Sequence, residues 1–383
     1  MTSSSLDAFA AAKLAQLEAA NLRRRLAVSD RLDALWIERG GRKLLSFSCN
    51  DYLNLSHDPR VKAAAIAAVE RYGAGAGASR LVTGNHPLLD ALEAKLAAFK
   101  GAEAACLFGS GYLANMGITP ALVGAGDIVF IDELAHACLW AGAQLSKAEI
   151  APFPHNDMDA LEQLMRTKRG GARHALVLTD GVFSMDGDLA PLPDIARLCA
   201  DYSCWLLADD AHGLGVVGGG RGSARAFTPA PQVDLQMGTL SKAAGSYGGY
   251  VCTTRNVVDL LVNRARTEVY STGLPPASAA AALAALEIME AEPDRGARAV
   301  ANAQRFATAI GAAKTETTIV PVLFGDAARA LEAQAVLERE GFLVVAIRPP
   351  TVPEGTARLR FAFTSNHPAD EIDRAAAIVR RLL

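Results

Sequence analysis

Two carboxylates, an imidazole and a lysine stand at spacings that could support chemistry together. Asp209, Asp210 and His212 follow the apolar run of residues 204–208, and Lys242 lies thirty residues beyond His212. The run is too short for a helix and is typical of a buried strand. Open α/β sheets bind ligands at the carboxyl ends of such strands. We therefore expect a ligand site at this edge of a sheet.

Lys242 closes the segment Thr239-Leu240-Ser241-Lys242, and small residues and glycines follow it. A lysine whose pKa is lowered at an active site can form a Schiff base with an aldehyde. An aspartate beside a pyridine nitrogen keeps that nitrogen protonated, so that the ring accepts electrons. Taken singly, a carboxylate pair after a strand is usually a solvated loop, and a lone lysine is a surface charge. Together, Asp209, His212 and Lys242 indicate pyridoxal phosphate (PLP) as a cofactor carried by Lys242.

The composition is that of a globular protein. A chain of 383 residues can form two domains, or one large domain with a smaller one attached. The net charge of −3 gives no reason to expect nucleic acid or a membrane as a partner. The six cysteines contain no CxxC pair, so we expect reduced core thiols in a cytoplasmic protein and no metal site. The N-terminus lacks the apolar core of a signal peptide.

Strands and helices are expected to alternate around the candidate residues. Short apolar runs predict strands at 104–108, 127–131, 175–179 and 204–208, which indicates an α/β fold with a mostly parallel sheet covered on both faces. An amphipathic helix is predicted over 5–26 and a hairpin over 34–47. We divide the chain into an N-terminal segment (1–50), a large PLP-binding domain (51–289) and a small α+β domain (290–383).

Other polar groups are predicted to lie near the same edge. The glycine turn at Gly111 and Tyr112 joins a strand to a helix, and the free N–H groups of a helix start bind anions such as a phosphate. His136, just beyond the strand 127–131, could lie over a planar ring. Arg358 and Arg360 project from one face of a late strand. Such arginines are usually on the surface, but arginine is also the preferred partner of a carboxylate.

A second glycine pattern offers a competing hypothesis. Residues 213–218 match GxGxxG after a strand, as in a nucleotide-dependent oxidoreductase. However, four residues separate the strand from the glycines, and the glycines at 219–222 cannot open the helix that this fingerprint requires. The glycine-rich loop at 73–80 follows a helix where the fingerprint needs a strand. A non-catalytic PLP-fold protein is disfavoured as well, because no catalytic position is missing.

From Leu22 onward the chain resembles the α-oxoamine synthases, fold-type I PLP-dependent enzymes with aspartate-aminotransferase architecture. The motifs that carry the resemblance are Ser48–Leu53, Gly75–Gly84, Gly181–Gly187, Asp209–Gly213 and Thr239–Lys242. The segments 22–25, 79–85 and 347–353 are similar to the branch that joins L-alanine to a pimeloyl thioester in biotin synthesis. The thiol would be CoA or an acyl carrier protein. Sister synthases, such as glycine C-acetyltransferase and aminolevulinate synthase, are the alternative.

The resemblance also implies a role for each site residue. Lys242 would carry the cofactor and move the Cα proton, Asp209 would pair with the pyridine nitrogen, and His136 would stack on the ring and face substrate. Further substrate contacts are implied for Arg23, Thr351 and Arg360, the last clamping the carboxylate of the amino acid. Further cofactor contacts are implied for Gly111, Tyr112, Ser184, His212, Thr239, Ser271 and Thr272. Ser271 and Thr272 would reach the neighbouring subunit of a homodimer with shared active sites.

Overall fold

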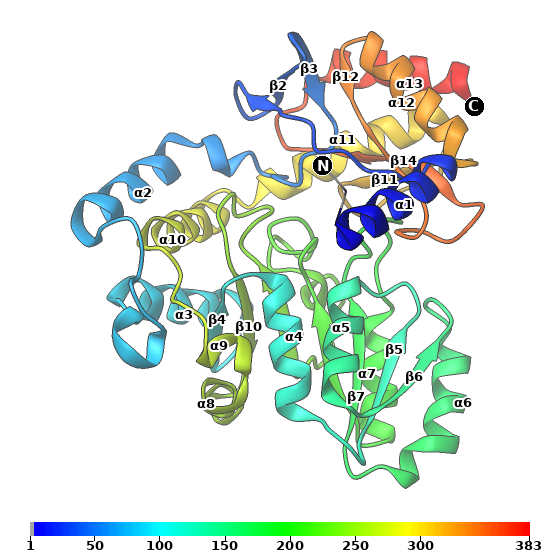
Figure 1. Cartoon of the computed structure of the whole chain (residues 1–383). Helices are drawn as coiled ribbons and strands as arrows, with labels where there is room; N and C mark the ends of the chain where they lie inside the picture. Colours follow the sequence, from blue (N-terminus) through cyan, green and yellow to red (C-terminus); the bar gives the residue numbers. More distant parts are fainter. Residues whose placement is uncertain (1–3) are drawn as a thin grey trace.

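A mostly parallel sheet forms the centre of the larger part of the molecule (Figure 1). The structure is a computed structural model that describes residues 4–383. The order of the strands is β4-β10-β9-β8-β7-β5-β6, and β10 runs antiparallel to its neighbours β4 and β9. The strands are β4 (Ala104–Phe108), β5 (Ile128–Asp132), β6 (Glu149–Phe153), β7 (Ala175–Asp180), β8 (Trp205–Asp209), β9 (Leu235–Thr239) and β10 (Gly249–Thr253). The four predicted strands and the predicted fold class are confirmed.

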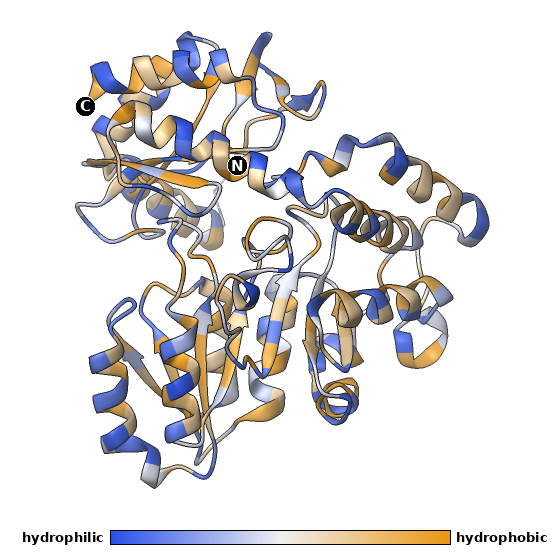
Figure 2. Cartoon of the chain, turned by 180° about the vertical axis from the view of Figure 1, so that it is seen from behind, coloured by the Kyte–Doolittle hydropathy of each residue, from blue (hydrophilic) through white to orange (hydrophobic). Residues whose placement is uncertain are grey.

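Helices cover both faces of this sheet because side chains alternate along its strands. Val129 and Ile131 of β5 pack with Leu139 in one core, whereas Ile128 and Phe130 pack in another. Figure 2 shows apolar strands between helices that turn polar residues outward. The helices of this part are α2 (Pro59–Tyr72), α3 (Pro87–Lys100), α4 (Gly111–Leu122), α5 (Ala137–Ser146), α6 (Met158–Lys168), α7 (Leu192–Asp201), α8 (Arg255–Arg264), α9 (Arg266–Val269) and α10 (Pro276–Ala291).

The C-terminal part folds around a second core of phenylalanine and aliphatic side chains. Its antiparallel sheet has the order β11-β14-β13. The predicted hairpin is present as β2 and β3, and β3 pairs in parallel with β12, so the N-terminal segment joins this part. The elements are β1 (Asp30–Arg31), β2 (Trp36–Arg39), β3 (Arg42–Ser46), α11 (Asp294–Ile310), β11 (Ile319–Gly325), α12 (Ala327–Arg339), β12 (Phe342–Leu343), β13 (Val345–Ile347), β14 (Ala357–Ala362) and α13 (Ala369–Leu382).

The N-terminal helix is shorter than predicted. Helix α1 spans Ser5–Ala19 and does not reach residue 26. None of its residues is buried, so no tertiary packing extends it. Asn21 has a φ of 56°, a left-handed conformation that stops a right-handed helix. The arginines at 23–25 therefore lie in an irregular segment and do not form a helix end.

None of the helices within residues 4–383 combines the length and the apolar character that a bilayer crossing requires.

Candidate active site

Asp209 lies at the carboxyl end of β8 and is buried, with 3% of its surface exposed. Its carboxylate accepts hydrogen bonds from the Asn115 side-chain amide on α4, at 2.7 Å, and from the Ala211 backbone N–H, at 3.0 Å. Both donors are uncharged. A buried carboxylate is costly without a cation, so Asp209 is suited to a cationic partner that its protein hydrogen bonds do not supply.

Asp210, the second carboxylate of the pair, points to a different set of partners. Its Oδ2 lies 2.6 Å from the ammonium of Lys100, which is fully buried, and its Oδ1 accepts from the Ser223 N–H at 2.9 Å. These contacts fasten the loop of residues 213–222, which consists of turns. Only the three-residue 3-10 helix Ser223–Arg225 follows these glycines, so this region lacks the α-helix that a strand–turn–helix dinucleotide site requires.

His136 follows β5 as the N-cap of α5 and lies beside the next carboxylate of the sheet edge. Asp180 is opposite Asp209 in the β7–β8 register and accepts a hydrogen bond from the His136 N–H at 2.7 Å. Burial and the neighbouring Asp209 raise the pKa of Asp180 well above its ordinary value. Burial lowers the pKa of His136, although Asp209 opposes this, so the ring is neutral at pH 7. Its Nδ1 accepts from the Cys138 N–H at 3.3 Å.

Lys242 follows β9 in a turn closed by a hydrogen bond from the Gly245 N–H to its carbonyl, at 2.8 Å. Burial lowers the pKa of Lys242 below its ordinary value of 10.5, while Asp209 and Asp180 raise it and Arg360 lowers it further. The charges of Asp209 and Asp180 therefore act on the amine of Lys242. A lysine with a lowered pKa is a competent nucleophile and base near neutral pH.

His212 and Arg360 meet at a buried tyrosine that sequence reasoning did not single out as a site residue. The Tyr52 hydroxyl lies 2.6 Å from His212 Nδ1 and accepts from Arg360 Nη2 at 3.3 Å. Arg360 also donates to Asn50 Oδ1, at 3.1 Å, and to the Ser184 carbonyl. Burial, Lys242 and Arg360 hold the pKa of His212 well below its ordinary value. The expectation that such arginines are usually on the surface is wrong here, because Arg360 is only 7% exposed.

The glycine turn and Thr239 form a close cradle at the start of α4. Ser110 caps this helix by accepting from the Leu113 N–H at 3.2 Å. The Gly111 and Tyr112 amides belong to the first turn, whose N–H groups have no carbonyl partner within the helix. A Cβ placed on Gly111 would lie 3.3 Å from the Thr239 Cβ. A side chain there would crowd this space, which is suited to an anion.

A cavity of about 910 Å³ opens beside these residues. Tyr112, His136, Ser184 and Thr351 line it, whereas Asp209 and Lys242 lie outside its lining. The loop at 349–354 forms one wall, so residues distant in sequence meet here.

Arg24, which sequence reasoning passed over, lines this cavity and donates to the Thr351 hydroxyl at 2.9 Å. Arg23, the predicted substrate contact, instead pairs with Glu18 at 3.0 Å. Arg348 donates to the Asn21 carbonyl, which also ties the 348–353 loop to the N-terminal segment.

Ser271 and Thr272 lie on the turn between α9 and α10. Thr272 is exposed and pairs with Ser79 in an isolated antiparallel bridge. Their contact with a second subunit stays a prediction.

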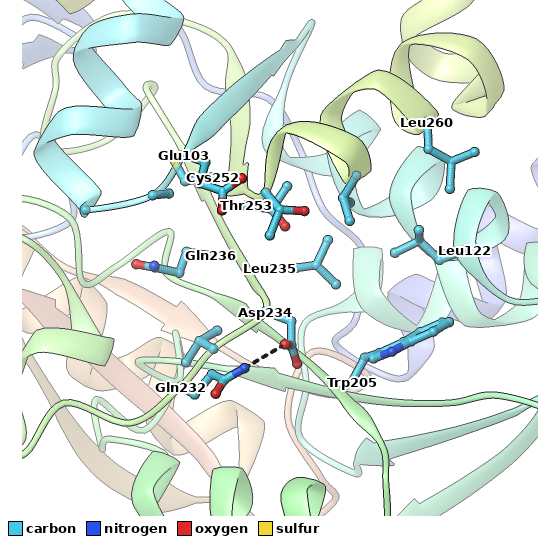
Figure 3. Close-up of a pocket in the computed structure, with 15 residues that line it drawn as sticks. Glu103, Leu122, Trp205, Gln232, Asp234, Leu235, Gln236, Cys252, Thr253 and Leu260 are labelled. Atoms are coloured by element: carbon cyan, nitrogen blue, oxygen red, sulfur yellow. Dashed lines mark hydrogen bonds between the residues drawn. The ribbon is translucent and has the colours of Figure 1, made fainter.

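A second cavity, of about 480 Å³, lies near the amino ends of β8 and β9, opposite the ends that carry the candidate site (Figure 3). Trp205 and Leu235, the first residues of β8 and β9, line it, whereas Asp209 and Thr239 end those strands. None of the candidate site residues borders this cavity.

Comparison with known proteins assigns the family. Residues 42–379 match the family aminotransferase class I and II. The 8-amino-7-oxononanoate synthase of Beijerinckia indica subsp. indica is 62% identical over 379 residues, which cover 99% of this chain and 98% of that protein.

Two solved structures extend the comparison. Serine palmitoyltransferase from S. paucimobilis, with a bound PLP–myriocin aldimine, aligns with a TM-score of 0.92 and 27% identity over 99% of this chain and 98% of that one. An 8-amino-7-oxononanoate synthase from Francisella tularensis has a TM-score of 0.75 and 29% identity over 88% of this chain and 97% of that one.

The fold and site define a fold-type I, PLP-dependent enzyme. The chain belongs to the aminotransferase class I and II family and, within it, to the 8-amino-7-oxononanoate synthases, which are acyltransferases.

The residues present fit PLP. A protonated pyridine nitrogen would supply the cation that the uncharged donors to Asp209 do not. The cradle at Gly111 and Thr239 would accept the phosphate, and Lys242 is the lysine of this edge whose pKa is lowered.

Proposed function

We propose that the chain condenses L-alanine with a pimeloyl thioester, releasing CO₂ and the free thiol and forming 8-amino-7-oxononanoate for biotin biosynthesis. The observation that carries this proposal is the 62% identity with a relative of that name over 99% of the chain. The serine palmitoyltransferase neighbour shares the fold at 27% identity, so it supports the reaction class and not the substrate. The acyl group would arrive on CoA or on an acyl carrier protein.

When bound, PLP supplies an electron sink that stabilises negative charge at the Cα of the amino acid. Asp209 would hold the ring nitrogen in its protonated form. Lys242 would attach the cofactor and, once released, take the proton from Cα and return it at the end. The lowered pKa of Lys242 supports this role, because a larger fraction of its amine is uncharged near neutral pH.

The other residues would orient the reactants. Arg360 is held by Asn50, Tyr52 and the Ser184 carbonyl, so its guanidinium is pre-organised to bind the alanine carboxylate. The neutral ring of His136 would lie against the cofactor and substrate. Gly111, Tyr112, Ser184, His212 and Thr239 would complete the cofactor contacts.

The acyl chain is expected to lie in the cavity of about 910 Å³, whose wall includes Thr351 and Arg24. Arg24 offers a cation at that wall, and we add it to the predicted contacts Arg23 and Thr351. We also propose a homodimer in which Ser271 and Thr272 approach the partner's phosphate. The six free cysteines are consistent with a cytoplasmic location.

A substrate panel tests the proposed function. Purified holoenzyme is offered L-alanine, glycine or L-serine with pimeloyl, acetyl, succinyl or palmitoyl thioesters. Released thiol, CO₂ and the mass of the aminoketone are measured. We expect turnover with L-alanine and pimeloyl thioester to exceed every other pair. A preference for glycine would assign the chain to a sister synthase instead.

A further inference from the structure

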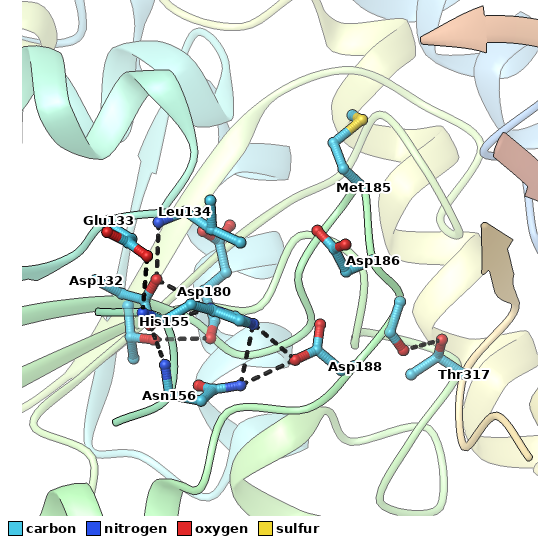
Figure 4. A network of polar contacts seen from close by, with 12 residues as sticks. Asp132, Glu133, Leu134, His155, Asn156, Asp180, Met185, Asp186, Asp188 and Thr317 are labelled. Atoms are coloured by element: carbon cyan, nitrogen blue, oxygen red, sulfur yellow. Dashed lines mark hydrogen bonds and ion pairs between the residues drawn. The ribbon is translucent and has the colours of Figure 1, made fainter. Parts of the chain in front are cut away.

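His155, between β6 and α6, hydrogen-bonds a carboxylate through each nitrogen of its ring (Figure 4). Nδ1 lies 3.1 Å and 3.2 Å from the two oxygens of Asp132, and Nε2 lies 2.9 Å from Asp188 Oδ2. A carboxylate only accepts hydrogen bonds, so both ring nitrogens must donate, which requires the imidazolium form. Burial lowers the pKa of His155, but the hydrogen bonds to Asp132 and Asp188 prevail and raise it to about 10. The Glu133 carboxylate also faces this segment, accepting from the His155 N–H at 3.3 Å.

Asp132, the first of the two carboxylates that bind His155, stabilises the turn that leads to His136. Asp132 ends β5, and its Oδ1 accepts from the Leu134 N–H at 2.8 Å. The Asp132 carbonyl accepts from the Ala135 N–H at 3.0 Å. Because His136 follows Ala135 directly, the position of Asp132 determines the position of His136, the residue predicted to stack on the cofactor ring.

Asp188, which carries the second carboxylate, closes the loop that carries Ser184 through its backbone carbonyl. The Phe183 N–H donates to the Asp188 carbonyl at 3.0 Å, and the Gly187 N–H donates to the Phe183 carbonyl at 2.8 Å. The Phe183 ring meets the His155 ring edge-on, with centroids 4.3 Å apart. His155 thus contacts both ends of this loop.

The C-terminal part holds the same loop from its other side. Thr317 Oγ1 donates to the Gly187 carbonyl at 2.6 Å, and Arg358 pairs with Asp186. Arg360 donates to the Ser184 carbonyl. The loop of residues 183–188 therefore lies between these contacts and the His155 bridge, and a shift of the loop would move the carbonyl that orients Arg360.

We propose that His155 is a positioning residue that fastens the loop of residues 183–188 to the turn after β5. In this way it keeps His136, Ser184 and Arg360 at their relative positions. The assignment rests on the proposed function, because that function gives these three residues their cofactor and substrate contacts.

The first test replaces His155 in the holoenzyme. Glutamine cannot donate to both carboxylates with the geometry of an imidazolium, so His155→Gln should lower kcat/KM for L-alanine by about 10²-fold, as expected for a small misplacement of orienting groups. His174→Gln is the matched control, since His174 is exposed and stacks on Trp205 at the other edge of the sheet. Kinetic constants of His155→Gln equal to those of the control would overturn the proposal.

The second test uses the cofactor-free protein and hydrogen exchange read by mass spectrometry. In His155→Gln, peptides over 132–136 and 183–188 should exchange about tenfold faster, as loss of a charge-assisted hydrogen bond predicts, while peptides of α11 should be unchanged. Asp188→Asn, which keeps the Asp132 contact, should give a smaller change in the same peptides. Unchanged exchange in both loops, or equal acceleration along the whole chain, would refute the positioning role.

The two proposals fail separately. A wild-type enzyme that does not condense L-alanine with a pimeloyl thioester would overturn the proposed function. The exchange measurement still decides the role of His155, because it needs neither substrate nor cofactor.

Discussion

Asn115 donates the shortest hydrogen bond that reaches Asp209, from Nδ2 to Oδ2 at 2.7 Å. Both side chains are buried, so water cannot replace the donor. Asn115→Leu keeps the approximate volume and removes the bond. The Asn115 Oδ1 atom is buried and has no hydrogen-bond partner among residues 4–383, so leucine also removes an unsatisfied group. We therefore expect the main loss in cofactor binding and turnover and a smaller loss in stability.

A hydrogen bond to a charged group contributes about 1.5–3 kcal/mol. If this stabilisation acts on Asp209 only when the cofactor is bound, its loss corresponds to about a 10- to 150-fold weaker PLP affinity or lower kcat. Equilibrium titration of the cofactor-free protein with PLP, followed by absorbance, measures the affinity. Steady-state release of thiol at saturating PLP measures kcat.

Thr119→Val is the matched control for this substitution. Thr119 lies one turn further along α4 and is fully buried, and its hydroxyl has no hydrogen-bond partner within the described part of the chain. Its replacement should leave PLP affinity and kcat within about twofold of wild type, since removing an unsatisfied group costs little. If Asn115→Leu and Thr119→Val have the same PLP affinity and the same kcat, the Asn115 hydrogen bond does not support cofactor binding or turnover.

Two further predictions follow from the site. Arg24→Ala should raise KM for the acyl thioester by about tenfold, the effect of losing one charged contact, and leave KM for L-alanine unchanged. Arg25 is an exposed neighbour that pairs with Glu18, so Arg25→Ala should change neither KM value. Equal kinetics of the two variants would remove Arg24 from the substrate contacts. Because the folded-state pKa of Lys242 is lowered, unfolding takes up a proton at pH values between that pKa and 10.5. Lys242→Met should therefore stabilise the cofactor-free protein at pH 7 and raise its urea midpoint. This gain should shrink as the pH approaches 10.5. A gain that does not depend on pH would show that the lowered pKa of Lys242 is not its cause.

The parts of the site predicted from sequence are those that local pattern determines. The apolar run 204–208 predicted β8 and placed Asp209 at its end. The glycine turn predicted a helix after β4, although α4 begins at Gly111, inside the predicted turn. Both inferences rest on residues adjacent in the chain. The division into 1–50, 51–289 and 290–383 stays a prediction. The pairing of β3 with β12 joins the first of these parts to the third.

Contacts between distant segments could not be predicted in this way. Asn115 lies 94 residues before Asp209 and Asn50 lies 310 before Arg360, and an asparagine on a helix or in a turn carries no signal of such a partner. The choice between Arg23 and Arg24 depends on the direction of side chains in an irregular segment. Helix α1 was predicted too long because its apolar spacing suggested a packing surface, yet none of its residues is buried.

His155 illustrates the same limit. It follows β6, a strand that the sequence pattern did not predict, and its carboxylate partners lie elsewhere in the chain, Asp132 at the end of β5 and Asp188 at the end of the loop of residues 183–188. The contacts of His155 with both carboxylates follow only from the parallel sheet, which brings the carboxyl ends of β5, β6 and β7 together.

The proposed chemistry requires PLP to be attached to Lys242. Borohydride reduction of the holoenzyme, followed by digestion and mass spectrometry, tests it directly, because reduction fixes the cofactor to the lysine that carries it. We expect the phosphopyridoxyl mass on the peptide that contains Lys242, and no such mass in Lys242→Ala. The phosphopyridoxyl group on another lysine, such as Lys100, which is buried against Asp210, would contradict it.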